Sequence, residues 1–113
     1  MALREPTYFV LAVLLDGPLH GYAIATRVAD LSDGRVRPTA GTLYGALERL
    51  RSEGLVEIER EEVVEGRKRR YHRLTGDGER VVRTEAARLR AAAEVVELRG
   101  VAARGRQRRP RPA

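Results

Sequence analysis

The feature that most constrains the fold is the segment 38–50, which combines a helix start with a single apolar stripe. Thr39 is a good N-cap residue, because its hydroxyl can accept a hydrogen bond from a free backbone N–H of the first helical turn. Apolar residues then recur at the three- and four-residue intervals of one α-helical face. They are Leu43, Ala46, Leu47 and Leu50. The segment is therefore predicted to be an amphipathic helix with one side in a core.

The opposite side of this predicted helix carries mostly small or hydroxyl-bearing residues near its N-terminal end. These residues are Gly41, Thr42, Tyr44, Gly45 and Glu48. Small residues permit close approach to another surface, and the free amides at a helix start attract phosphate. A helix that enters the major groove and reaches base edges has this arrangement, so we interpret the segment as a DNA-recognition helix.

Composition excludes several classes of protein. The 113 residues suffice for one small domain. No cysteine is present, so disulfides and thiolate metal sites are excluded, which suits a cytoplasmic protein. His20 and His72 lie far apart in sequence, and a structural or surface role is expected for each, with no metal site. Neither Ser32 nor Ser52 has the sequence context of a catalytic nucleophile, so no enzyme and no cofactor are expected.

The positive charge is concentrated at the C-terminal end. The formal net charge is +6, yet residues 99–113 hold six arginines and no acid, which leaves sixteen residues of each sign in 1–98. Residues 100–113 are predicted to be a disordered tail. Such a tail either adds weak, salt-sensitive affinity for nucleic acid or has no specific role. The balanced part contains one local basic cluster, formed by Arg67, Lys68, Arg69 and Arg70.

Two further helices are expected before the recognition helix. The apolar run 8–15 predicts a buried helix with Thr7 as its N-cap, and Asp16-Gly17-Pro18 ends it. This run is too short to span a bilayer and its flanks do not fit a signal peptide, so no membrane association is expected. A second helix is predicted from His20 to about residue 31. Its inner stripe is Ile24, Val28 and Leu31.

A β-hairpin is expected after the recognition helix, which Gly54 ends by taking a left-handed conformation. In a first strand expected over 55–61, Val56 and Ile58 alternate with acidic residues, as in a half-buried strand. A turn around Gly66 would lead to an antiparallel strand over 69–74. Three helices and a hairpin, in that order, predict a mainly α winged helix-turn-helix. The basic cluster would lie at the hairpin tip, as a wing that contacts phosphates.

A last helix is expected over 76–99, ended by Gly100. Its apolar residues are spaced 4, 3, 4, 3, the pattern of a heptad seam over about two heptads. They are Val82, Ala86, Leu89, Ala93 and Val96. Since a winged helix in residues 1–75 already has its own core, this stripe needs another partner. A second copy of the chain is preferred, and packing back on the same domain is the alternative.

Four segments together resemble the PadR family of bacterial transcriptional regulators, over about residues 5–98. They are Leu19-His20-Gly21-Tyr22, Pro38-Thr39-Ala40-Gly41-Thr42-Leu43-Tyr44, Glu53-Gly54-Leu55-Val56 and the run from Gly66 to Thr75. The resemblance implies a homodimer, usually a repressor, with the third helix in the major groove and the wing on the flanking backbone. The C-terminal helix would form much of the dimer interface, as in the short branch of the family.

The resemblance also implies which residues face DNA. They are Tyr22, Thr39, Gly41, Thr42, Tyr44, Arg67, Lys68, Arg69 and Arg70. Some short members use a tryptophan in the dimer-interface pocket to stack on flat ligands, and this chain has no tryptophan. A different small-molecule effector at the dimer interface, or none, is left open.

The sequence therefore predicts a homodimeric transcription factor that binds a palindromic double-stranded DNA operator, with recognition helices about 34–36 Å apart. The alternative is a winged helix that holds a partner protein without reading DNA. Acidic residues of the hairpin suggest this alternative, because they would repel phosphate. They are Glu57, Glu59, Glu61, Glu62 and Glu65. Their position beside Thr42 and Tyr44, or away from them, distinguishes the two.

Overall fold

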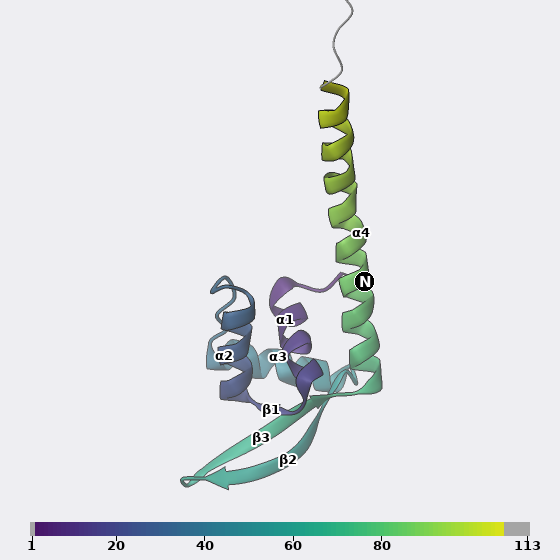
Figure 1. The fold of residues 1–113 in the computed structure, drawn as a ribbon. Helices are drawn as coiled ribbons and strands as arrows, with labels where there is room; N and C mark the ends of the chain where they lie inside the picture. Colours follow the sequence, from purple (N-terminus) through teal and green to yellow (C-terminus); the bar gives the residue numbers. More distant parts are fainter. Residues whose placement is uncertain (1, 108–113) are drawn as a thin grey trace, which may run out of the picture.

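The computed structural model describes residues 2–107, with side chains as far as residue 99. Its elements are α1 (Glu5–Val13), the 3₁₀ turn η1 (Leu14–Asp16), β1 (Leu19–His20), α2 (Gly21–Leu31), α3 (Ala40–Ser52), β2 (Val56–Val64), β3 (Arg67–Leu74) and α4 (Gly76–Gln107). Helices α1, α2 and α3 gather above a small sheet, the β2–β3 hairpin projects from them, and α4 runs away from the hairpin as a long rod (Figure 1). The predicted winged helix-turn-helix is confirmed.

The core forms where the apolar stripes of the first three helices meet. Leu43, Leu47 and Leu50 are buried and Ala46 is half-buried, as the spacing in the recognition helix predicts. The largest side chains that are almost completely buried are Leu11, Val13, Ile24, Val28, Leu47, Leu50 and Val56. One residue of α2, Leu31, was wrongly assigned to the inner stripe.

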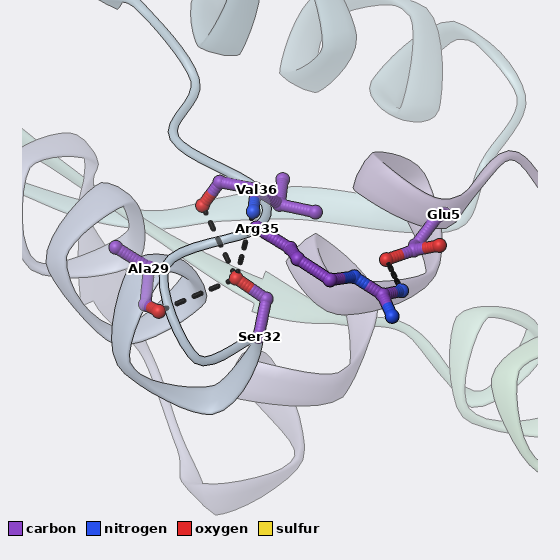
Figure 2. A network of polar contacts seen from close by, with 5 residues as sticks. All are labelled: Glu5, Ala29, Ser32, Arg35 and Val36. Atoms are coloured by element: carbon purple, nitrogen blue, oxygen red, sulfur yellow. Dashed lines mark hydrogen bonds and ion pairs between the residues drawn. The ribbon is translucent and has the colours of Figure 1, made fainter.

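Leu31 is 61% exposed, although the sequence places it on the inner stripe of α2. The stripe of α2 continues instead at intervals of four residues, from Ile24 through Val28 to Ser32, which is buried. Polar contacts hold Ser32 in this place (Figure 2). Its hydroxyl accepts from the backbone N–H of Val36 at 2.9 Å and lies 3.3 Å from the carbonyl oxygen of Ala29. These bonds fix the turn that leads from α2 to the recognition helix.

Both predicted boundaries of α3 are confirmed, and the predicted start of α1 is wrong. Thr39 caps α3, because its Oγ1 accepts from the backbone N–H of Thr42 at 3.2 Å, and Gly54 follows the helix with φ +76°. Thr7 is not the cap of α1. The helix begins earlier, at Glu5, since a proline in the first turn costs no hydrogen bond. Thr7 is buried inside it and accepts from Arg49 Nη2 at 3.3 Å.

The sheet has three antiparallel strands in the order β1-β3-β2, one strand more than predicted. In β1, Leu19 pairs with His72, and His20 pairs with Tyr71. The hairpin turn contains only Glu65 and Gly66, both with positive φ, which is the geometry that suits two-residue hairpins. Both hairpin strands are therefore longer than predicted. As a result, the basic cluster extends along β3 from the turn and is not confined to the tip.

Helix α4 combines a packed beginning with a projecting remainder. Thr75 caps it by accepting from the backbone N–H of Gly78 at 3.0 Å. The prediction that Gly100 ends it is wrong, because α4 continues to Gln107. One glycine inside a helix costs about 1 kcal/mol, and the good helix formers on both sides outweigh this cost. The predicted disorder over 100–107 is corrected accordingly, and 108–113 lie outside the described residues.

Candidate nucleic-acid interface

The N-terminal half of α3 presents an open surface without charged groups. Thr39, Gly41, Thr42 and Tyr44 are all exposed. A Cβ atom added at Gly41 or Gly45 would have no neighbour within 4 Å, so nothing in the described chain covers this side. The hydroxyl of Thr39 donates to that of Thr42 at 2.9 Å. This surface can approach another molecule closely, as predicted for the recognition helix.

Tyr44 connects the recognition helix to the start of α2. A Cβ atom added at Gly21 would lie 3.7 Å from Tyr44 Oη, an ordinary contact distance, so the phenol lies over the first residue of α2. Tyr44 remains 57% exposed, and the neighbouring Tyr22 is 80% exposed. Two phenol rings are thus exposed on the surface, although neither is needed to fill the core.

A hollow of about 580 Å³ lies between these tyrosines and the hairpin. We call it the wing hollow. Its lining residues are His20, Gly21, Tyr22, Tyr44, Arg67, Lys68, Arg69 and Arg70. The structure thus brings together six of the nine predicted DNA-facing residues, and the other three are on the exposed surface of α3. His20 and Gly21 were not assigned to the site, although the Leu19-His20-Gly21-Tyr22 segment was recognised.

The charge of the wing hollow is positive. Glu61 forms ion pairs with Lys68 at 3.2 Å and with Arg70 at 3.0 Å. The hydrogen bond from Lys68, together with the charges of Lys68 and Arg70, lowers the pKa of the Glu61 carboxyl, so this group stays ionised. Arg67 and Arg69 form no ion pair within the described part of the chain. Two of the four cations are therefore paired with one carboxylate, and the other two are in no ion pair among the described residues.

Four of the five acidic residues of the hairpin are paired with hairpin cations, and none of the five lines the wing hollow. Glu57 bonds Arg73 at 2.6 Å. Glu59 and Glu62 bond Arg60 at 3.0 and 2.8 Å. None of the lining residues carries a carboxylate, so the acids do not stand beside Tyr44. Acidic residues beside Thr42 and Tyr44 would have repelled phosphate, so their placement away from the wing hollow favours DNA over a protein partner.

The root of the wing is held by a stack of side chains. The His20 and Tyr71 rings meet edge to face, with centroids 5.4 Å apart. On Tyr71, the Arg60 guanidinium lies 4.0 Å from the ring centroid, a favourable cation–π geometry. The wing is therefore fixed to the start of α2 by side chains as well as by the β1–β3 pairing.

The predicted seam of α4 divides into a buried and an exposed part. Val82 is only 2% exposed and belongs to the core of its own chain, so its assignment to a dimer seam is corrected: the beginning of α4 packs on α1. Ala86, Leu89, Ala93 and Val96 are exposed. Val95 and Leu98 are exposed as well, but they lie outside the predicted seam.

A second hollow, of about 370 Å³, lies between α1 and α4 beside this exposed seam. Its lining residues are Leu3, Glu5, Tyr8, Phe9, Arg35, Glu85 and Leu89. Glu85 on this side of α4 is only 3% exposed. Hydrogen bonds from Arg88 and from the backbone N–H of Leu3 lower the pKa of Glu85 to about 2. This buried carboxylate ties the N-terminal segment to α4.

An exposed recognition helix beside a basic hairpin defines a winged-helix protein of the DNA-binding class. Comparison with known families narrows this class. Residues 10–84 match the model of the transcriptional regulator PadR-like family. The chain belongs to this family, which consists of transcriptional regulators and not of enzymes.

Individual relatives agree with this assignment. A 37.1 kDa protein in transposon TN4556 of Streptomyces fradiae is 41% identical over 86 residues, which are 76% of this chain and only 23% of that protein. A PadR family transcriptional regulator from Eggerthella lenta is 30% identical, with a TM-score of 0.64, over 82% of this chain and 81% of its own. Bacillus subtilis PadR, solved in complex with operator DNA, is 22% identical, with a TM-score of 0.64. The match covers 72% of this chain and 46% of that protein, which shares the fold.

No helix among the described residues has the length and apolar character that a membrane span needs.

Proposed function

We propose that this protein is a homodimeric repressor that binds a palindromic DNA operator in the bacterial cytoplasm. The observation that carries the proposal is the wing hollow, where Tyr22 and Tyr44 face four cations and no lining carboxylate. The operator complex of Bacillus subtilis PadR supports DNA as the partner. Repression would follow from occupancy of a promoter by the dimer.

In this proposal each element contacts a different part of the duplex. The uncharged start of α3 enters the major groove, where Thr39, Gly41, Thr42 and Tyr44 approach base edges. Tyr22 contacts the backbone beside the groove. The basic cluster binds flanking phosphates, which supply affinity and orientation without reading sequence.

The proposed dimer is formed by the exposed part of the α4 seam. Leu89 belongs both to this seam and to the hollow between α1 and α4, so a partner's α4 would cover the seam and the rim of that hollow together. The same hollow is the place where a small-molecule effector would bind, since it also touches Arg35 in the turn before the recognition helix. An effector would change DNA affinity only by its differential affinity for the two dimer geometries.

The proposal is tested by genome-wide capture of DNA fragments with the full chain, followed by anisotropy titration of a recovered duplex and its scrambled counterpart. We expect a clear preference for the recovered sequence at physiological salt. Equal affinity for both duplexes would refute specific DNA recognition and favour the protein-partner alternative.

Replacing Tyr44 with alanine is expected to weaken binding to the recovered operator roughly tenfold to a hundredfold, as for the loss of one base-reading side chain. Binding to scrambled DNA should change much less. The fold should persist, because the side chain is 57% exposed. Tyr44→Phe is the matched control that keeps the ring over Gly21 and removes only the hydroxyl. Undiminished operator affinity of Tyr44→Ala would reject the assignment.

Leu89→Glu is expected to convert the dimer to a monomer at micromolar concentration, because an unpaired carboxylate would be buried in the seam. Sedimentation velocity measures this change, and the dimer dissociation constant should rise by at least about a hundredfold. Ala87→Glu places the same charge on the other side of α4 and should leave the dimer intact. A dimer that survives Leu89→Glu would contradict the proposed seam.

A further inference from the structure

His20 lines the wing hollow but has no role in the recognition described so far. Its backbone pairs with Tyr71 through β1, and its ring stacks on the same tyrosine. Its Nδ1 accepts a hydrogen bond from the backbone N–H of Ala23 at 3.4 Å and so caps α2. The ring is therefore held in one orientation where α2, the recognition helix and the wing meet.

The cap determines which ring nitrogen of His20 carries the hydrogen. A neutral imidazole that accepts at Nδ1 has its hydrogen on Nε2, at the other side of the ring. Burial, and next the charge of Arg69, lower the pKa of His20 below its ordinary value. Protonation would also put a hydrogen on Nδ1 against the Ala23 N–H. The titratable and charged groups around His20 are Glu62 of β2, Arg69 and Tyr71 of β3, Tyr22 of α2 and Tyr44 of α3.

The donors that surround the wing hollow all suit a phosphate. Four cationic residues, two tyrosines and His20, all of which carry hydrogen-bond donors, line the volume of about 580 Å³. A backbone phosphate offers several acceptor oxygens and a negative charge, and phosphates receive most hydrogen bonds in protein–DNA interfaces. His20 would add a donor that is held rigidly and is not charged.

We propose that Nε2–H of His20 donates a hydrogen bond to a DNA backbone phosphate in the wing hollow. This contact fixes the position of the wing relative to the recognition helix on the duplex. The inference rests on the proposed function, because it requires DNA in the wing hollow, and it adds a contact residue that was not among the predicted DNA-facing residues.

The test compares the wild-type chain with His20→Ser by fluorescence anisotropy. Two duplexes are used, a captured operator and one of arbitrary sequence, each at several salt concentrations. Serine keeps a capping oxygen for α2 but has no N–H donor. We expect about tenfold weaker binding of both duplexes, the usual effect of losing a hydrogen bond to a charged group. The slope of log affinity against log salt should stay unchanged, because a neutral donor releases no counterion.

Unchanged affinity of His20→Ser would overturn the contact. A salt slope lowered by about one would also overturn it, since His20 would then act as a cation. The thermal unfolding of His20→Ser is measured beside that of His20→Thr, which caps α2 as well. If only His20→Thr folds like the wild type, it replaces His20→Ser in the binding test.

Tyr71→Leu distinguishes a direct contact of His20 with DNA from an indirect effect of His20 on the position of the wing. It removes the ring on which His20 stacks but leaves Nε2–H in place. If the double variant with His20→Ser binds no more weakly than Tyr71→Leu alone, His20 acts only through the stack and the proposal fails. The duplex of arbitrary sequence keeps the two hypotheses apart. Wild-type protein without operator preference would refute the proposed function, whereas the loss at His20 is still measured on that duplex.

Discussion

Alanine at all four positions of the basic cluster is expected to weaken binding to any duplex by roughly a hundredfold or more at about 0.1 M salt. The salt slope should fall by about two to four per protomer, since each lost phosphate contact removes about one. Arg67 and Arg69 should account for most of this effect. Lys68 and Arg70 share the carboxylate of Glu61, which offsets part of their charge toward DNA.

A matched pair of double variants separates this local effect from a change in net charge. Alanine at Arg67 and Arg69 removes two charges from the wing hollow. Alanine at Arg80 and Arg83 removes the same charge from exposed positions on α4. Only the first pair should lower the salt slope. Equal slopes for both pairs would mean that the wing does not touch phosphates.

Gly78→Ala is expected to reduce the free energy of unfolding by roughly 2–3 kcal/mol or more, at the upper end of the cost of overpacking. A Cβ atom at this position would lie 2.0 Å from the carbonyl oxygen of Leu55 and 3.0 Å from Leu74 Cδ2. The helix cannot easily shift, because Thr75 donates its N–H to the same Leu55 oxygen at 3.1 Å.

Thermal or chemical unfolding at one fixed protein concentration measures this loss, and the melting temperature should fall by roughly 10–20 °C. Gly76→Ala is the natural control, two residues earlier in the same helix. Its added Cβ would meet only Arg80 Nη1, at 3.8 Å, so its stability should stay close to that of the wild type. If Gly78→Ala were as stable as the wild type, the first turn of α4 would not pack against the carbonyl of Leu55, which precedes β2, as described.

Elements that depend on local signals were predictable from the sequence. The recognition helix is one of these, since its cap at Thr39 and its leucine stripe are both encoded within fourteen consecutive residues, 39–52. Strand β1 was missed because two residues carry no periodicity, and its partner Tyr71 lies far along the chain. The extension of β2 through Val64 was missed for a related reason. An acidic run is typical of a solvated turn, and the basic residues of β3 that pair with it are known only from the structure.

The site was predictable only in part. The basic cluster and the tyrosines carry chemistry that is visible in isolation, but the hollow between them exists only after folding. His20 was assigned to structure because a single histidine gives no signal until its cap and its stacking partner are placed. The heptad pattern of α4 predicted a seam but could not show that Val82 packs within its own chain, since spacing does not specify a partner.

Because α4 is one unbroken helix with its first turns embedded in the core, it links the two ends of the molecule mechanically. At 1.5 Å per residue its 32 residues span about 48 Å. In the proposed dimer, a small change in the angle between two such helices would be magnified along their length into a larger displacement of the two recognition helices. The angle between the helices would therefore control which spacing of DNA grooves the proposed dimer can match.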